Sequence, residues 1–359
     1  MLNKKKKYLI LFSFIAVLIL AFSSAIIGCE NVSFFSQAII GHFRIMRDRM
    51  PIEKIIADKS LDEDSLNKLR LILEVRSFAS KELGLPENKS YTVYSNIKSQ
   101  YAGWNIYVAP KFSIEPKKWC FPIAGCVVYR GYFVKDDALK FAKEEEKKGF
   151  DVFIGPFNAY STLGWYDDPI LSSHLRLNPI RLAGLIIHEL AHQKLYIKGD
   201  SRFNEGFAVT VERAGVLQWL KSTGRNNEIP QALETWRQED LCVEKILKAR
   251  TELSNIYSST SDAKILEEKK QSIFKKLKED LCGIACVGVN LPKTDGNELK
   301  LNNAYLIPIN TYYSLVPVFQ NILNGVDGHL PLFFKKVKEL GELPYQERQS
   351  KMKLLQKIK

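Results

Sequence analysis

The sequence of 359 residues lacks a strict Gly-x-y period and any short internal repeat. Those absences exclude collagen-like, propeller and solenoid architectures. It also lacks low-complexity character: with 46% hydrophobic and 26% charged residues, the composition is that of a globular chain. No convincing linker interrupts residues 29–359, so we expect a single domain with ample chain to bury a core.

Motifs for nucleic-acid binding are also missing, although the net charge is +12. No RNA-binding aromatic motif or helix-turn-helix pattern is present, and the export signal described next argues further against a nucleic-acid partner. Basic residues are dense in residues 335–359. Either they help to hold the protein against anionic lipid, or they form an ordinary solvated surface.

The first 28 residues predict a targeting segment. Lysines 4–7 precede an uncharged run of 20 residues, Tyr8–Ile27, which leads into Gly28 and Cys29. The segment resembles the lipobox of bacterial lipoprotein signal peptides, which implies cleavage before Cys29 and lipidation of its thiol. An uncleaved membrane anchor is the alternative, and a soluble secreted form is a third. Every version places the body in the cell envelope, on the periplasmic or extracellular side of a membrane.

If Cys29 carries lipid, five other cysteines remain. Cys120 and Cys126 flank a turn-rich spacer and form the favoured disulfide. Two more, at positions 282 and 286, would stand in poor bridge geometry with each other on a helix, so one of them can pair with Cys242. No paired C-x-x-C occurs, which makes a zinc site built from cysteines the weaker interpretation.

The hydropathy pattern predicts an α+β fold, mostly helical, with a small β-sheet. Residues 30–86 are expected to be helical, with Pro51 opening one helix and Ser60 capping another. Strand-like segments and one charged helix that ends at Gly149 occupy residues 90–155. Further helices are expected in three stretches, a core at 178–225, a charged arm at 244–285 and C-terminal helices at 301–359.

Only five histidines occur in the chain, and His188 and His192 form a His-Glu-x-x-His pattern with Glu189. A chance match is improbable at this composition. Asn178 suits the start of a helix through this pattern, and Gly199 suits its end. Both imidazoles then project from one face, about 6 Å apart, as two ligands of one zinc ion require. Glu189 can reach a water molecule beside that ion.

A third metal ligand is suggested by residues further along the chain. The metzincin extension is excluded, because positions 195 and 198 hold leucine and lysine instead of glycine and histidine. Asn204 and Glu205 open an expected second helix, capped by Asp200 or Ser201. The pair of motifs resembles the gluzincins, the thermolysin-like and zinc-aminopeptidase superfamily, although the spacing is shorter than in typical members. That resemblance implies Glu205 as the third ligand, with Asn204 preceding it.

Glu212 is the rival to Glu205 for this role. It shares the same helix face but lies about 10 Å further along the axis, so both cannot easily bind one ion. We expect Glu212 to support a ligand or to contact the substrate. Asp200 and His174 are weaker candidates for the third ligand.

The resemblance extends over nearly all of the chain after the leader. Stretches at 119–126, 129–133, 159–169, 302–304 and 311–312 look like a bacterial family that takes the label aminopeptidase from its zinc motif. This implies a zincin-like metalloprotease domain. By resemblance and residue type, Tyr312 is the first candidate and Arg130 the second for donating a hydrogen bond to the oxyanion. Glu212 and Asp168 are candidates for binding the α-ammonium of a substrate.

We therefore expect a zinc-dependent metallopeptidase of the cell envelope, acting on peptides or proteins and most simply an aminopeptidase. Zn²⁺ held by His188, His192 and Glu205 would activate a water molecule, and Glu189 would act as general base. An envelope endopeptidase of the same mechanism is one alternative. A membrane-tethered zinc-binding scaffold without turnover is the other, although such a closed site would have no use for Glu189.

Overall fold

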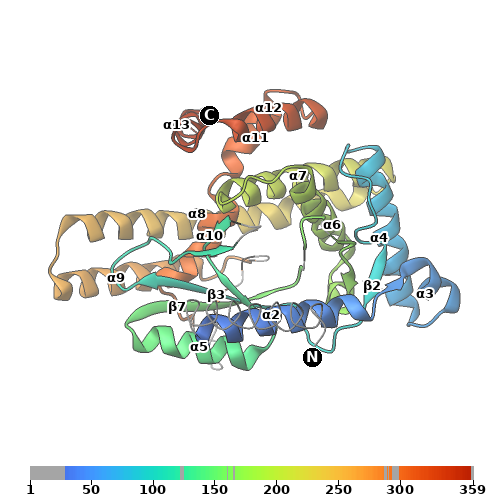
Figure 1. The fold of residues 1–359 in the computed structure, drawn as a ribbon. Helices are drawn as coiled ribbons and strands as arrows, with labels where there is room; N and C mark the ends of the chain where they lie inside the picture. Colours follow the sequence, from blue (N-terminus) through green and yellow to red (C-terminus); the bar gives the residue numbers. More distant parts are fainter. Residues whose placement is uncertain are drawn as a thin grey trace, which may run out of the picture.

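The computed structural model describes residues 29–121, 125–159, 161–164, 166–286, 289, 291–292 and 299–356. The predicted leader, residues 1–28, lies outside the described residues, which begin at Cys29. Figure 1 shows an α+β fold that is mostly helical with small sheets, as the sequence predicts. None of the described helices combines the length and the apolar character needed to cross a membrane.

The strands are short and form two three-stranded sheets and one hairpin. Their bounds are β1 (Met50–Pro51), β2 (Val93–Ser95), β3 (Gly103–Pro110), β4 (Trp119–Phe121), β5 (Gly125–Val127), β6 (Arg130–Tyr132), β7 (Phe150–Phe157) and β8 (Ile170–Leu171).

The helices supply most of the remaining structure. Their bounds are α2 (Cys29–Arg47), α3 (Ile52–Asp58), α4 (Glu63–Lys81), α5 (Lys135–Lys147), α6 (Pro179–Lys194), α7 (Ser201–Ser222), α8 (Ile229–Ser259), α9 (Ala263–Leu281), α10 (Leu306–Tyr313), α11 (Val316–Asn324), α12 (Leu330–Glu342) and α13 (Tyr345–Leu355). Three short 3-10 turns are η1 (Ser172–Arg176), η2 (Asn226–Glu228) and η3 (Asn303–Tyr305).

The antiparallel sheet β6-β3-β7 separates two layers of helices. Successive side chains of a strand point to opposite faces, so Ile106 and Val108 pack with α5 and Phe34 of α2. Tyr107 and its cross-strand partner Phe153 face the other way, toward α8, α9 and α10. The second face of this sheet is therefore the one that meets the helical half of the molecule.

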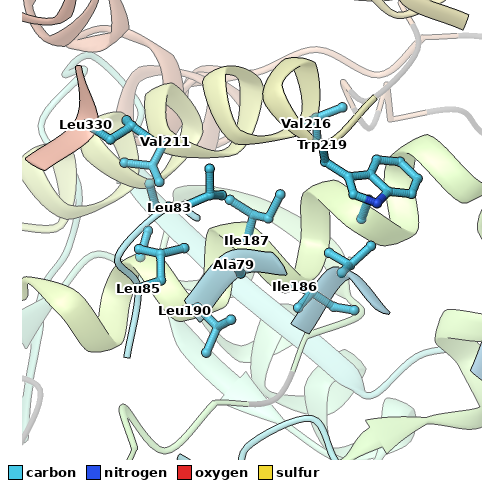
Figure 2. Close-up of a cluster of buried hydrophobic side chains, with 14 of the residues drawn as sticks. Ala79, Leu83, Leu85, Ile186, Ile187, Leu190, Val211, Val216, Trp219 and Leu330 are labelled. Carbon is cyan, nitrogen blue, oxygen red and sulfur yellow. The ribbon is translucent and has the colours of Figure 1, made fainter. Parts of the chain in front are cut away.

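A large apolar core joins α3, α4, α6, α7 and the C-terminal helices. In Figure 2, Ile186, Ile187 and Leu190 of α6 lie among side chains from the end of α4 and from α7. All three are fully buried. Burying side chains of this size contributes roughly 1.5–3 kcal/mol each, so α6 is held rigidly by its apolar side.

Several local predictions hold, and several need correction. Asn178 caps α6 as predicted, because its side chain accepts a hydrogen bond from the backbone N–H of Arg181 at 2.9 Å. Asp62, not Ser60, caps α4, since the carboxylate of Asp62 accepts from the N–H of Ser65 at 2.9 Å. Pro51 is the N-cap of α3 and pairs in β1 instead of opening the helix.

The end of α6 and the sheet also differ from expectation. The helix ends at Lys194, not at Gly199, because Leu195 takes up an extended conformation. Gly199, with a φ of 80°, makes the turn into α7 instead. The strand-like segments expected within residues 90–155 do not form one sheet: β6, β3 and β7 form one, β4 and β5 form a hairpin, and β2 pairs with β1 and β8 in a sheet of its own. The helical arm begins at α8 and returns through α9, a longer hairpin than predicted.

Disulfides join two pairs of cysteines. Cys120 and Cys126 stand opposite each other in the β4–β5 hairpin. Cys242 of α8 is bonded to Cys286, which follows α9, and so closes the base of the helical hairpin. Cys282 is exposed with a free thiol.

Candidate metal centre

Helix α6 presents two different sides. Its apolar residues enter the core, whereas His188, Glu189 and His192 line a cavity on the opposite side. The two histidines are one helical turn apart, and their ring centroids are 4.8 Å apart. Since the apolar side is fixed by packing, the imidazoles have little freedom to move apart.

Helix α7 brings Glu205 to these histidines. The three ligand atoms form a nearly equilateral triangle: His188 Nε2 to His192 Nε2 is 3.2 Å, and Glu205 Oε2 lies 3.3 Å from each. A tetrahedral zinc ion with bonds of 2.0–2.1 Å requires ligand atoms about 3.3–3.4 Å apart. Among the described residues, these three form the group of histidine and carboxylate ligands able to hold a metal ion.

Close contacts between the carboxylates and the imidazoles shift the pKa values of Glu205 and His188. Burial alone would raise the pKa of Glu205, but the imidazoles of His192 and His188 outweigh burial and bring the pKa down to about 2. Burial would lower the pKa of His188, but Glu205 and Glu212 outweigh it and raise that pKa well above its usual value. The carboxylate is thus held in the ionised form that a metal ligand needs.

Glu212 contacts His188 on the side of the imidazole ring opposite the ligand triangle. Its Oε2 is 3.0 Å from His188 Nδ1, while His188 Nε2 points to Glu205. A carboxylate on the far nitrogen of a histidine fixes its tautomer and orientation and increases its basicity as a ligand. The structure therefore separates the two rivals: Glu205 joins the triangle, and Glu212 orients His188.

Asn204, the residue before Glu205, stabilises the connection between α6 and α7. Asn204 is buried; its side-chain Oδ1 accepts from the N–H of Ile197 at 2.7 Å, and its Nδ2 donates to the carbonyl of Ile197 at 2.9 Å. Asp200 caps α7 by accepting from the N–H of Phe203 at 3.2 Å. These bonds fix the first turn of α7, and with it the position of Glu205.

Glu189 is almost fully buried and lines the same cavity. Burial raises its pKa, while the charges of His192 and His188 oppose that rise. A carboxyl group with a raised pKa beside a metal site is suited to take and return a proton near neutral pH. It does not belong to the ligand triangle.

Tyr312 of α10 packs against His188. Its ring stacks on His188 with a centroid distance of 6.3 Å and an interplanar angle of 20°. The charge of Glu205 and then burial raise its pKa well above the usual value, so the phenol stays protonated. Tyr312 thus lines the cavity beside His188 with a protonated phenol.

The cavity itself has a volume of about 590 Å³. One wall is the face of the β6-β3-β7 sheet that carries Tyr107 and Phe153, and the other is formed by α6, α7 and α10. Small-molecule and peptide sites of 300–1,000 Å³ with a few polar groups are typical of enzymes. The metal-ligand triangle lies in the wall formed by α6 and α7.

Arg130 does not line this cavity, and its proposed role as an oxyanion donor is wrong. It pairs with Ile106 across β6 and β3, so it faces the α5 layer, while its neighbours Tyr129 and Gly131 face the cavity. Its guanidinium lies 4.2 Å from the ring centroid of Phe34. Arg130 therefore packs among aromatic rings behind the sheet.

Asp168 is also absent from the cavity lining, so the prediction that it contacts the substrate is wrong. Fully buried, it accepts hydrogen bonds from the N–H of Thr162 at 3.0 Å and from the Thr162 hydroxyl at 2.7 Å. Gln193 Nε2 donates to its second oxygen at 3.4 Å. Asp168 shapes the loop of residues 161–164, of which Ser161 and Leu163 do line the cavity.

The side chains of His174 and Asp200, the weaker ligand candidates, make their contacts away from the ligand triangle. His174 Nδ1 accepts from the N–H of Leu171 at 3.2 Å, and Nε2 donates to the carbonyl of Asn158 at 2.7 Å. Both ring nitrogens are used, and burial lowers the pKa of His174 to about 4. Asp200 forms a buried ion pair with Arg348 of α13, 3.1 Å from its guanidinium.

A second polar group in the cavity was not predicted from the sequence. Arg213 of α7 forms ion pairs with Glu239 at 2.9 Å and Asp240 at 2.8 Å. The hydroxyl of Tyr313 donates to Glu239 Oε1 at 3.1 Å. Arg213 directly follows Glu212, but its partners lie on α8, so the local pattern of α7 gave no signal of this network.

The fold and the site together define a class: an α+β protein whose cavity holds a His-His-Glu group with a further buried glutamate beside it. Comparison with known families agrees with a peptidase-like function. The chain belongs to the family described as Putative aminopeptidase, whose model matches residues 33–352. No curated protein and no solved structure matched the chain.

Proposed function

We propose that this protein is a zinc-dependent metallopeptidase of the gluzincin type. The observation that carries the proposal is the triangle of His188, His192 and Glu205, whose 3.2–3.3 Å edges fit a tetrahedral zinc ion, with Glu189 in the same cavity. When bound, zinc supplies a Lewis acid that lowers the pKa of a water molecule and polarises a carbonyl. A closed structural site would need a fourth protein ligand, which the described residues do not bring to this triangle.

In this proposal each cavity residue has one task. Glu189 accepts a proton from the attacking water and later donates it to the leaving amine, as a buried carboxyl group with a raised pKa can do. Tyr312, kept protonated, donates a hydrogen bond to the carbonyl oxygen as negative charge develops there. Glu212 holds the ring of His188 in place.

Aminopeptidase activity is the form of this proposal that the family description favours. An exopeptidase must pair the free α-ammonium of its substrate with an acidic group. Glu212 lines the cavity, and because its Oε2 is bonded to His188, we propose that its Oε1 pairs with that α-ammonium. An envelope endopeptidase of the same mechanism is distinguished by its acceptance of blocked internal peptides.

We further propose that residues 29–359 form one peptidase domain tethered to a bacterial membrane. The support is the sequence of the leader: four lysines, an uncharged run of 20 residues, and Cys29 directly after Gly28. Cleavage before Cys29 and lipidation of its thiol would leave the domain on the periplasmic or extracellular face. Mass spectrometry of the membrane-extracted protein tests this directly, since an uncleaved leader and a lipidated Cys29 differ in mass.

The test of the peptidase proposal compares zinc content and hydrolysis in parent and variants. We expect about one zinc ion per chain in the parent and in Glu189→Gln, but hydrolysis of peptides in the parent alone, with a loss of about 10²–10⁴-fold in the variant. His192→Ala should lose both zinc and activity. Amino-acid anilides and blocked internal peptides, assayed side by side, separate exopeptidase from endopeptidase activity.

Tyr312 offers a matched control in the next residue. Tyr312→Phe should lower kcat by about 10²–10³-fold, as loss of one oxyanion donor does, with zinc content unchanged. Tyr313→Phe removes a hydroxyl in the same cavity that is already bonded to Glu239, so its effect on kcat should be far smaller. Zinc without hydrolysis in the parent, for every peptide class, would favour the scaffold alternative. Absence of zinc would overturn the proposal.

A further inference from the structure

The first helix of the described chain carries an exposed apolar face. We call the apolar face of α2 the set Phe35, Ile39, Ile40 and Phe43, which are 42%, 55%, 58% and 66% exposed. Phe35, Ile39 and Phe43 are spaced by four positions and share one side of the helix, and Ile40, three positions before Phe43, widens this strip. Four large apolar side chains on one exposed helix face are uncommon on a soluble surface.

The other side of α2 is firmly docked on the β6 strand. Phe34 and Ile45 are buried, and Gly41 lies so close to the ring of Phe133 that no side chain would fit there. Gln37 Nε2 donates to the carbonyl of Gly131 at 3.2 Å, and Gln37 Oε1 accepts from the N–H of Phe133 at 3.0 Å. The packing thus fixes which side of α2 is presented outward.

The sequence before α2 indicates what this face meets. The uncharged run Tyr8–Ile27 is long enough to span a hydrocarbon core, and α2 begins at Cys29. From Cys29 to Phe35 is about 9 Å along a helix axis, so the apolar face begins within two helical turns of the end of the leader. Whether Cys29 is lipidated or the leader is retained, the apolar face starts at the membrane surface.

Charge at the end of the helix fits the same environment. Arg44 and Arg47 lie in the last turn of α2 and both are exposed, and Arg47 also pairs with Asp48 at 2.8 Å, so Arg44 is the main cation offered there. An interfacial helix places apolar side chains among the acyl chains and basic side chains at the headgroups, where anionic lipid attracts them. The face therefore has both chemical features that a phospholipid surface selects.

We propose that the apolar face of α2 lies in the headgroup region of the membrane to which the leader directs the chain. This contact orients the body, because a lipid or a single span alone leaves it free to rotate about its tether. Gly131 and Phe133, which Gln37 binds, also line the cavity. The sheet wall of the cavity is thereby joined to the membrane-bound helix; this inference rests on the proposed membrane tether and does not depend on the peptidase activity.

Site-specific photo-crosslinking tests the proposal in the full chain. A photoreactive phenylalanine analogue is placed at Phe35 or Ile39, and the protein is reconstituted in vesicles of phosphatidylethanolamine and phosphatidylglycerol that contain an alkyne-tagged phospholipid. Ile265 of α9, 42% exposed, and Leu233 of α8, 49% exposed, are matched control positions. We expect several-fold more lipid crosslinking at the two α2 positions than at the controls.

Other outcomes overturn the inference. Equal lipid crosslinking at all four positions would show that the body has no preferred orientation on the membrane. Crosslinks from Ile39 to a second copy of the chain, or to residues 8–27, would show that protein covers the face. The variant Phe35→Ser with Ile39→Ser should stay folded by circular dichroism, since both side chains are exposed, and should keep peptidase activity on a soluble peptide.

Discussion

Glu212 offers the sharpest test of how the proposed metal site is held. The variant Glu212→Gln keeps the size of the side chain but removes the charge that faces His188 Nδ1 at 3.0 Å. Loss of such a partner typically lowers metal affinity 10–100-fold, or about 1.4–2.7 kcal/mol. Because the Glu212 side chain is 28% exposed and glutamine can still accept a hydrogen bond, we expect the lower half of that range.

A second variant, in α6, disturbs the same contact between Glu212 and His188. A Cβ atom at Gly184 would lie 2.8 Å from Glu212 Oε1 and 3.3 Å from its Cγ, so Gly184→Ala should displace the carboxylate from His188. Alanine is favoured over glycine in a helix by about 1 kcal/mol, which offsets the cost of moving one flexible side chain. Zinc affinity should therefore fall while the free energy of unfolding of the apoprotein is kept or rises.

The assay is competition for zinc against a chromophoric chelator at constant pH, with urea unfolding of the metal-free protein measured in parallel. Glu234→Gln is the control, because Glu234 is an exposed carboxylate of α8 outside the cavity. Zinc affinity within twofold of the parent in both Glu212→Gln and Gly184→Ala would refute the orienting role of Glu212.

Three further predictions concern stability. Asp200→Asn breaks the buried ion pair with Arg348 and should cost about 3–5 kcal/mol, seen as a lower urea midpoint; an unchanged midpoint would contradict it. The depressed pKa of buried His174, about 4, means that stability present above pH 6.5 is lost as pH falls toward 4, by roughly 3 kcal/mol; His174→Gln should lack this component of the acid loss in urea titrations. Replacing Cys242 and Cys286 by serine opens a loop of sequence separation 44 and should cost about 4 kcal/mol in the same assay, whereas replacing the free thiol at position 282 should not.

The parts of the site that depend on local spacing could be predicted from the sequence. His188 and His192 share a face because they are one turn apart, and Asn178 marks the start of their helix. Glu205 was implied by the resemblance to the gluzincins, and the structure brings it within 3.3 Å of both imidazoles. Helical spacing alone accounts for the two histidines, whereas Glu205 depended on that resemblance.

The site predictions that the structure contradicts depend on strand register and on loop conformation. Which face of β6 carries Arg130 is decided by its pairing with Ile106, and a shift of one residue would reverse it. Asp168 looks like a site residue because it is acidic and near aromatic residues, but its oxygens are used within the loop of residues 161–164. The partners of Arg213 lie on α8, beyond the reach of any helical period.

The ion pair between Asp200 and Arg348 also affects the order in which the protein can mature. Asp200 fixes the first turn of α7, which carries Glu205, while Arg348 additionally donates to the carbonyls of Gly341 and Leu343 in the C-terminal helices. A chain interrupted before residue 348 would contain the three residues of the ligand triangle but not the ion-pair partner of Asp200. If the ligand triangle binds a metal ion as proposed, we expect truncated products that lack this ion pair to bind the metal more weakly than the full chain.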